Sequence, residues 1–382
     1  MNFDFSEEQV MLRDSVARFI QDDYSFDARR EIAASDTGMS AEHWQTFAEL
    51  GWLSVPFAEE HGGFGGGPVD IMVMMEEFGK GLVLEPYFAT VILFGGVLQR
   101  AGSPEQQAAY IPRIIDGSCL GAFAFAERQS RYELADVKTT ASADGDDFVL
   151  NGEKVVVQNG ANADTLIVAA RTSGEQCDEE GVSLFIVDAA ADGVTRMSYA
   201  LMDGQRAANV TFNNVRLSRD ALLGEEGKAM PAVSRVALES CVALAAEGLG
   251  IMGQLNSKTL EYTKQREQFG VAIGSFQALQ HRMVDTFMSY EQTKSLLYRA
   301  VCTLEKQDED PARDIHALKV MLDRAGRHVH AEAIQLHGGM GLTDEMDIAH
   351  YAKRLITLNA MFGDGDHHQA RFNALDFASS AA

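Results

Sequence analysis

One acidic residue, Glu247, lies within a run of apolar and small residues at positions 236–252. An ionised carboxylate is costly to bury alone, so such a residue is either paired or kept as a base for proton transfer. A glutamate that simply faces solvent is the plainer alternative. Ala246, Gly248 and Gly250 add little bulk, and glycine costs a helix about 1 kcal/mol. We therefore expect another backbone or a ligand to lie against this helix.

A second candidate is Arg266, which follows the same helix and precedes the break at Phe269 and Gly270. The planar guanidinium group presents several donors that match a phosphate group. A surface salt bridge to Glu261 or Glu267 explains the arginine equally well from sequence alone.

Glycines 338, 339 and 341 form a third candidate site. Without a Cβ atom, backbone amides can approach an anion or a ring closely, which suits a dinucleotide. The same glycines could equally well terminate a helix.

Two acidic residues and two histidines, within Asp364–His368, have the residue types of a metal site. Adjacent histidines point in different directions, and no second cluster completes a ligand set. We expect no metal here, and instead a cofactor contact or the start of a helix. The four cysteines are widely spaced and lack metal-site spacing, so we interpret them as reduced thiols: Cys119, Cys177, Cys241 and Cys302.

The elements that must position these residues change character twice along the chain. Residues 1–117 show helical periods that begin with a capping box at Ser6–Gln9, and residues 118–226 show short β-rich segments separated by Gly, Asn and Asp. From 227 to 382, helical periods return at 235–265, 275–305, 311–336 and 344–360. The pattern predicts an α+β protein with a helical domain, a middle antiparallel β-barrel-like domain and a helical bundle.

Two glycine-rich motifs do not predict phosphate binding. Gly62–Gly67 follows no strand and lacks the Lys-Ser/Thr ending of a phosphate loop, so we interpret it as a turn. Gly248–Gly253 fits GxGxxG but lies inside a helical period, without the strand that the Rossmann fingerprint requires.

The overall charge excludes some classes of partner. The 32 basic and 56 acidic residues give a net charge of −24, which argues against nucleic acid and anionic membranes as partners. The N-terminus lacks the order of a signal peptide, and no apolar stretch approaches the ~20 residues of a membrane span. We expect a cytoplasmic protein.

Several segments, in their order and spacing, resemble the acyl-CoA dehydrogenase family. Within the family the chain looks most similar to the small subunit of pimeloyl-CoA dehydrogenase and to subunits of steroid side-chain degradation, through FAFAER (123–128), AEG (246–248) and FGDGDHH (362–368). The segments that carry the wider resemblance are REQFGVAIGSFQ (266–277), QLHGGMG (335–341), GWL to GGFG (51–65), NGEK (151–154) and AK (352–353).

The resemblance implies a flavin-dependent oxidoreductase that oxidises an acyl-CoA thioester to the 2-enoyl-CoA. It implies FAD as cofactor, an electron-transferring flavoprotein as acceptor, and a homo- or heterotetramer, with a homologous large subunit in the second case. In similar enzymes the arginine that matches Arg266 binds the FAD pyrophosphate of a neighbouring subunit, and the residues that match Phe269 and Gln277 line the cofactor site. The loop that matches Gln335–Gly341, with Gly338 and Gly339, holds the adenosine side. On the flavin side the resemblance indicates Phe125, Glu127 and Gln158.

This chain departs from the family at several of these positions. Ala126 and Arg128 flank Glu127 where Thr-Glu-Pro is usual, and Val156–Gln158 replaces Trp-Ile-Thr. His350-Tyr351 replaces Arg-Asp, and residues 362–365 lack the usual catalytic glutamate.

The catalytic base must therefore come from another position. Isovaleryl-type enzymes carry it on the first long C-terminal helix, at a position that aligns near Ser240, two helical turns before Glu247. Similar steroid-type subunits have a glutamate at the position of Glu247. We predict Glu247 as the base, with Glu239 and Asp364 as reserves. The alternatives are a non-catalytic or half-site subunit that completes the FAD site of a larger homologue, and an oxidase that passes electrons to oxygen.

Overall fold

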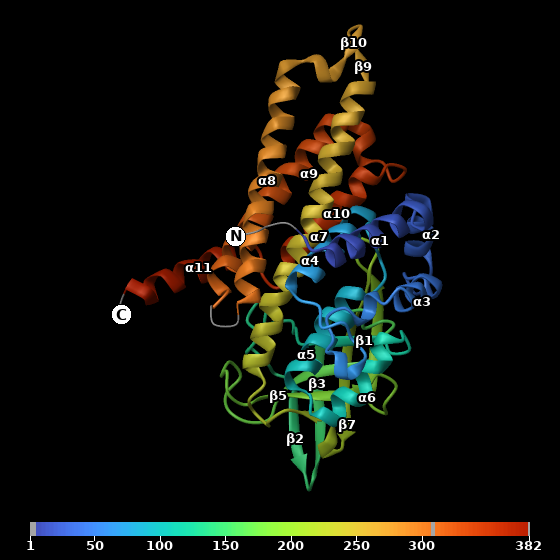
Figure 1. Ribbon diagram of the computed structural model, residues 1–382. Coiled ribbons are helices and arrows are strands. Elements are labelled where there is room, and N and C mark those ends of the chain that lie inside the picture. The colour runs from blue at the N-terminus through green and yellow to red at the C-terminus, as the bar shows by residue number, and fades with distance from the viewer. Residues whose placement is uncertain (1–4, 307–309, 381–382) are drawn as a thin grey trace. The chain divides into compact units, whose positions relative to one another are not determined.

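The computed structural model describes residues 5–306 and 310–380, and Figure 1 shows their elements. The chain divides into two compact units that cut across the three predicted segments, because helices from both ends of the chain pack together. Unit 1 comprises Met1–Arg30, Gly67–Val83 and Cys241–Ala382, and unit 2 comprises Glu31–Gly66 and Leu84–Ser240.

Unit 1 is helical. The capping box is confirmed, because the Ser6 hydroxyl accepts from the backbone N–H of Gln9 and the Gln9 side chain accepts from that of Ser6. Four long helices, predicted from their periodicity, are confirmed, and α11 begins in the segment for which a helix start was one of two expectations. The elements are α1 (Glu7–Asp23), α4 (Pro68–Gly81), the later part of α7 (Met230–Gln265), α8 (Gln277–Glu305), α9 (Ala312–His337), α10 (Asp347–Ala360) and α11 (Gly365–Ser380), with the short hairpin β9 (Glu267–Gln268) and β10 (Val271–Ala272) and 3₁₀ helices at Ile273–Ser275 and Gly338–Leu342.

The glycines of α7 serve helix packing within unit 1. A Cβ atom added at Gly250 would come within 2.0 Å of the Glu76 carbonyl oxygen, and one at Gly79 within 2.1 Å of the Glu247 carbonyl oxygen. The backbones of α4 and α7 are thus in direct contact. The predicted close neighbour of this helix is another backbone.

Unit 2 combines short helices with a sheet. Helix α2 (Phe26–Ala34) crosses from unit 1 into unit 2. The other helices are α3 (Ala41–Glu49), 3₁₀ helices at Trp52–Ser54, Glu59–His61 and Arg219–Ala221, a π-helix at Phe88–Gly95, α5 (Gly96–Ala101) and α6 (Pro104–Ile115).

The sheet has the strand order β6-β7-β3-β2-β4-β5-β8, and β1 pairs with β4. Most neighbours are antiparallel, as predicted, but β1 runs parallel to β4. The strands are β1 (Gly121–Ala124), β2 (Thr140–Asp144), β3 (Asp147–Gln158), β4 (Thr165–Arg171), β5 (Val182–Asp188), β6 (Val194–Ala200), β7 (Arg206–Leu217) and β8 (Leu222–Leu223).

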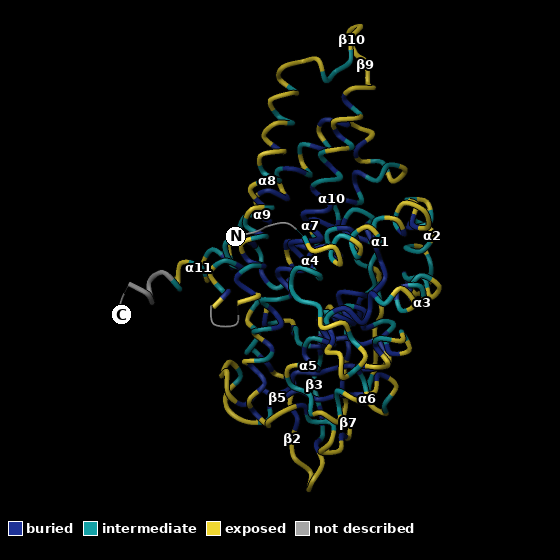
Figure 2. The backbone as a smooth tube through the Cα atoms, in the orientation of Figure 1, coloured by how far each residue is buried: buried dark blue, intermediate teal, exposed yellow. Residues whose placement is uncertain are grey.

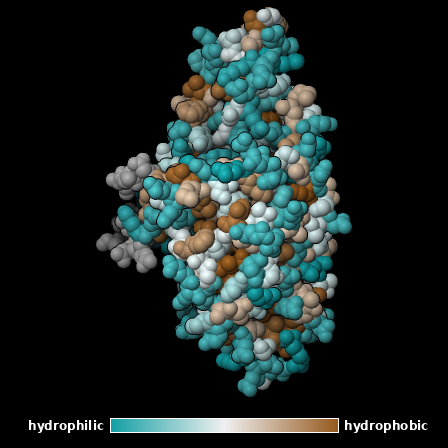
Figure 3. All heavy atoms as spheres, turned by 45° about the vertical axis from the view of Figure 1, so that its right-hand side comes forward, coloured by the Kyte–Doolittle hydropathy of each residue, from teal (hydrophilic) through white to brown (hydrophobic). Residues whose placement is uncertain are grey.

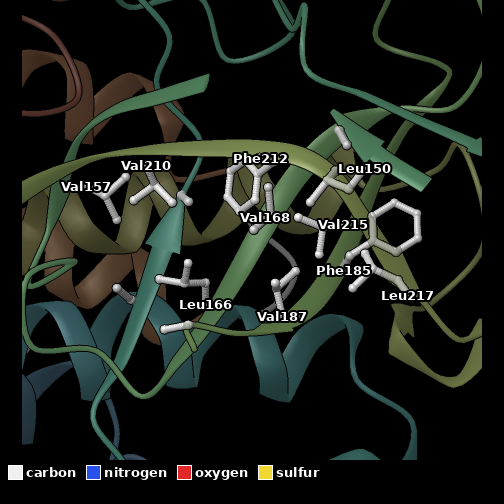
Figure 4. Close-up of a cluster of buried hydrophobic side chains, with 14 of the residues drawn as sticks. Leu150, Val157, Leu166, Val168, Phe185, Val187, Val210, Phe212, Val215 and Leu217 are labelled. Carbon is white, nitrogen blue, oxygen red and sulfur yellow. The ribbon is translucent and has the colours of Figure 1, made fainter. Parts of the chain in front are cut away.

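One face of the sheet forms the core of unit 2. Figure 4 shows Val157 beside Val210 at one end of this core and Phe185 near Leu217 at the other. Because Val157 occupies the core near the end of β3, the strand brings its last residue, Gln158, to the core's edge.

Helix α7 is long and apolar enough to cross a membrane by length and composition alone, contrary to the prediction that no such stretch exists. However, 78% of its most apolar window is buried within the protein, and Figure 2 shows buried backbone along much of the helix. We therefore assign α7 to the core. The face drawn in Figure 3 is mainly hydrophilic, in keeping with the acidic composition.

Candidate active and cofactor site

Glu247 is buried in unit 1 and paired with Arg354. The glutamate on α7 and the arginine on α10 are each only 4% exposed. The guanidinium Nε atom donates to Oε1 at 2.6 Å and Nη2 donates to Oε2 at 2.8 Å, which is a bidentate pair. Of the alternatives left open by the sequence, the structure excludes the solvent-facing glutamate and shows a paired one.

Arg354 was not predicted. A signal for it exists in the sequence, because it lies in the buried stripe of α10 that includes Tyr351, Leu355 and Leu358. A cation at such a position needs a buried acceptor. Tyr351 also fixes α10, since its hydroxyl donates to the carbonyl oxygen of Lys80 at 2.6 Å.

The two reserve carboxylates have other roles. Glu239 is partly exposed and accepts hydrogen bonds from Arg100 and Arg235. Asp364 precedes α11, and its Oδ1 atom accepts from the backbone N–H of His367 at 2.9 Å, which is the geometry of a helix cap. The predicted helix start at this segment is therefore confirmed.

The Arg266 guanidinium group is exposed, and no side-chain hydrogen bond or ion pair holds it within residues 5–306 and 310–380. The salt bridge considered from sequence does not form, because Glu261 pairs with Lys264 at 2.7 Å instead. Phe269, at the turn between β9 and β10, is 93% exposed and has a positive φ of 56°. The tip of this helical hairpin is coloured as exposed in Figure 2, and its residues Arg266 and Phe269 offer a cation and an aromatic ring to solvent.

The other predicted cofactor residues of unit 1 lie close to this tip. Tyr262 stacks on His337 with ring centroids 4.3 Å apart, which brings the glycine loop next to the end of α7. A Cβ atom added at Gly338 or Gly339 would meet nothing within 4 Å. We name these exposed residues the exposed cofactor surface: Arg266, Phe269, Gln277, Gln335, Gly338 and Gly339.

In unit 2, Glu127 is engaged in the scaffold. Burial alone would raise the pKa of its carboxyl group, but the charge of Lys154 and hydrogen bonds from Lys154, Gln129 and the Thr139 backbone lower that pKa to about 2. The Lys154 Nζ atom donates to Glu127 at 2.7 Å and to the Phe125 carbonyl oxygen at 3.1 Å. We therefore assign the Glu127 side chain to positioning the strand ends.

Gln158 follows an irregular stretch of β3. A β-bulge interrupts the pairing with β7 between Lys154 and Val157, and Val156 within it has a φ of 51°. A β-branched residue at positive φ is strained, and such strain is concentrated at functional sites. The Asn209 side chain holds the bulge by accepting from the Val156 backbone N–H at 3.2 Å. Half-buried Gln158 then lines a small cavity of unit 2.

Of the two histidines considered as metal ligands, buried His368 pairs with His316 instead. The Nδ1 atoms of His316 and His368 are 2.9 Å apart, and burial lowers the pKa of His368 to about 2. Within the described part of the chain, no three His, Cys, Asp or Glu side chains are grouped as a metal site would require.

Comparisons with known proteins agree with this architecture. Three family models match the chain, described as the N-terminal, middle and C-terminal domains of acyl-CoA dehydrogenase, over residues 6–118, 122–215 and 232–370. A probable acyl-CoA dehydrogenase of Bacillus subtilis, YngJ, is 30% identical over 359 residues, which cover 91% of this chain and 92% of that protein.

Two solved structures are similar over nearly their whole length. The Tcur3481-Tcur3483 steroid ACAD is 28% identical, with a TM-score of 0.88 and coverage of 98% of this chain and 99% of the other. The FAD complex of PigA is 26% identical, with a TM-score of 0.90 and coverage of 97% and 98%.

Proposed function

Because the chain belongs to the acyl-CoA dehydrogenase family, we propose that it oxidises the Cα–Cβ bond of an acyl-CoA thioester with Glu247 as the base. The α-proton passes to the Glu247 carboxylate, and the β-hydrogen leaves with its electron pair. A separate protein, an electron-transferring flavoprotein, then reoxidises the enzyme. Bound FAD supplies the hydride acceptor.

The observation that carries this proposal is the buried carboxylate of Glu247, which is paired with Arg354 and only 4% exposed. A carboxylate that acts as a base must be unprotonated and shielded from bulk water before it reacts. The bidentate contact with Arg354 balances the negative charge of such a buried carboxylate, so protonation of Glu247 is not needed to balance it. The backbone contact with Gly79 fixes the turn of α7 that carries Glu247. An α C–H group is a weak acid, so hydrogen bonds to the thioester oxygen must also stabilise the developing negative charge.

The residues of unit 1 fit the cofactor. The Arg266 guanidinium group is available to a pyrophosphate, and the open space at Gly338 and Gly339 admits a ring or an anion to the backbone. Phe269 and Gln277 are exposed beside them. Gln158 would hold the flavin side in unit 2.

A purely structural ion pair is the competing account of Glu247, and a double variant separates the two. Removing one partner of a buried pair leaves an uncompensated charge, whereas replacing both with apolar residues is often tolerated. We expect Glu247→Leu/Arg354→Leu to fold and to retain FAD, but to show no reduction of the flavin by acyl-CoA in stopped-flow absorbance.

Matched single variants test whether the loss of flavin reduction is specific to Glu247. Glu239→Gln and Asp364→Asn should reduce the flavin at rates within about threefold of the parent. Glu247→Gln, which keeps the size of the side chain, should bind acyl-CoA but also fail to reduce the flavin. Normal reduction in the folded double variant would move the base to Glu239 or Asp364.

A second candidate function is a half-site subunit that completes the FAD site of a homologous partner. The exposed cofactor surface favours it, since the Arg266 side chain makes no hydrogen bond or ion pair with the described residues of its own subunit, and Ala126 and Arg128 depart from the family's flavin motif. Purification of the chain alone is the test. A yellow protein that bleaches with acyl-CoA is self-sufficient, whereas a colourless protein that gains FAD only with a homologue is a half-site. Oxygen consumption during turnover would instead indicate an oxidase.

A further inference from the structure

The cavity beside Gln158 lies entirely within unit 2 and has a volume of about 20 Å³, which is room for one water-sized group. The turn after α2, the start of the π-helix, the end of β3 and the start of β7 form its wall. The lining residues used below are Glu85, Asn159, Asn162 and Arg206.

Glu85 brings an acidic side chain to this wall and is only 3% exposed. Its Oε1 atom accepts from the backbone N–H of Ser40 at 3.2 Å, at the N-terminus of α3, where a negative charge is favoured. The His43 Nδ1 atom is 3.6 Å from the same oxygen. The second oxygen, Oε2, is buried and has no hydrogen-bond partner among the residues that the structure describes.

Asn159 brings an amide donor and is 6% exposed. Its Oδ1 atom accepts from the Asn162 side chain at 3.1 Å, which determines the orientation of the amide. Its Nδ2 atom is then left without a hydrogen-bond partner within the described part of the chain. The residue has a φ of 54°, which asparagine tolerates better than most residues.

Several hydrogen bonds hold this wall in place. The Asn162 side chain also donates to the Thr37 carbonyl oxygen at 2.9 Å, and the Asn159 backbone N–H donates to the Arg206 carbonyl oxygen at 2.9 Å. The Arg206 guanidinium group donates to the carbonyl oxygens of Ala33 and Asp36 at 3.2 and 3.3 Å. An unsatisfied buried polar atom is destabilising, so a cavity that holds two of them in a hydrogen-bonded wall is suited to receive a polar group.

The two unpaired atoms, Glu85 Oε2 and Asn159 Nδ2, determine which chemical group fits the cavity. It must donate to the Glu85 carboxylate and accept from the Asn159 amide, and a hydroxyl group does both. A carbonyl group only accepts and an ammonium group only donates, so each would leave one atom unpaired. A carboxylate would meet the like charge of Glu85.

We propose that this cavity binds a hydroxyl group on the acyl chain of the substrate. The proposal rests on the proposed function, in which Gln158 contacts the flavin and the acyl chain therefore passes this end of β3. It narrows the substrate to a hydroxylated acyl thioester, in preference to a dicarboxylyl or an unsubstituted one.

The test compares three series of acyl-CoA thioesters of four to twelve carbons, ending in a hydroxyl, a methyl or a carboxylate group. Each is titrated into the FAD-loaded protein, and Kd is measured from the change in flavin absorbance. We expect the hydroxyl series to bind at least tenfold more tightly than the methyl series at one or more chain lengths. The carboxylate series should bind more weakly than both.

Two variants connect that preference to the cavity. Glu85→Leu removes the acceptor, and Asn159→Gly removes the donor at a φ that glycine readily adopts. Either variant should bring the ratio of the Kd values of the methyl and hydroxyl series close to one. Glu77→Gln, a buried carboxylate of unit 1, should leave the ratio unchanged. Equal binding of the hydroxyl and methyl series, or a preference that survives both variants, overturns this inference but not the proposed function. The cavity would then hold only a water molecule. If no thioester of any series binds, the proposed function fails with it.

Discussion

At the scale of single residues, buried charges in both units are balanced by side chains far away in the sequence. Glu247 meets Arg354 across 107 positions, and Glu127 meets Lys154 across 27. The apolar neighbours of Glu247 were enough to predict that this glutamate is buried or paired. Its partner could not be predicted, because only the packing of α10 against α7 brings the two together.

The Glu127–Lys154 pair predicts a specific dependence of stability on pH. The pKa of Glu127 is lowered from 4.5 to about 2 in the folded protein, chiefly because burial is outweighed by Lys154 and the hydrogen bonds around it. The folded state therefore binds fewer protons than the unfolded state between these values, so this stabilisation is complete above pH ~4.5 and is lost as the pH falls towards 2.

We expect Glu127→Gln to lower the free energy of unfolding at pH 7 by about 3 kcal/mol, because it leaves Lys154 as a buried charge. The difference from the parent should shrink as the pH falls from 4.5 to 2. Urea unfolding across this range measures both effects. The control is Glu153→Gln, which breaks an exposed pair with Arg128 and should cost less than about 1 kcal/mol. Parallel curves for Glu127→Gln and the parent would contradict the assignment.

At the scale of elements, the sequence predicted which segments are helical more completely than it predicted how the helices pack. The long helical periods of α7 to α10 are local, so their existence could be predicted from spacing alone. Helix α11 lies in a segment interpreted through its Asp and His residues, and the parallel pairing of β1 with β4 joins residues 44 positions apart, which local patterns do not predict. The glycines of α7 predicted a close neighbour but could not distinguish a ligand from α4.

The contact between α4 and α7 predicts unequal effects of glycine substitution. Gly250→Ala would drive a methyl group to within 2.0 Å of the Glu76 carbonyl oxygen, so the helices must separate. We expect a loss of at least about 2 kcal/mol in the free energy of unfolding. The measurement is chemical denaturation at neutral pH.

Gly96→Ala in α5 is the matched control. Its added Cβ atom would meet the Val236 side chain at 3.6 Å, an ordinary contact, and alanine favours the helix over glycine. That variant should be neutral or more stable by up to about 1 kcal/mol. Equal effects of the two substitutions would mean that helix propensity, and not the contact with α4, decides the cost at Gly250.

At the scale of the whole molecule, the predicted cofactor residues fall in two separate groups. Gln158 at the end of β3 and Phe125 directly after β1 belong to unit 2, whereas the exposed cofactor surface belongs to unit 1. The sequence resemblance named both groups as candidates but could not indicate their exposure. This surface offers an available arginine, a 93% exposed phenylalanine and open glycines to a ligand. In the half-site function proposed above, that ligand is FAD shared with a homologous subunit.

This arrangement predicts that FAD retention depends on Arg266 and on association. Arg266→Gln removes the cation that would face the pyrophosphate, and the exposed side chain has no hydrogen bond or ion pair to lose within residues 5–306 and 310–380. We expect at least a tenfold weaker affinity for FAD, with a melting temperature of the FAD-free protein within about 1 °C of the parent. The flavin-to-protein ratio after gel filtration at several protein concentrations measures the retention of FAD, and the parent should lose FAD only on dilution.

The control is Arg219→Gln, which changes another exposed arginine, in unit 2, and should retain FAD. If Arg266→Gln binds FAD as tightly as the parent at every concentration, the cofactor does not contact this surface, because no other described cation of the exposed cofactor surface could replace the lost charge.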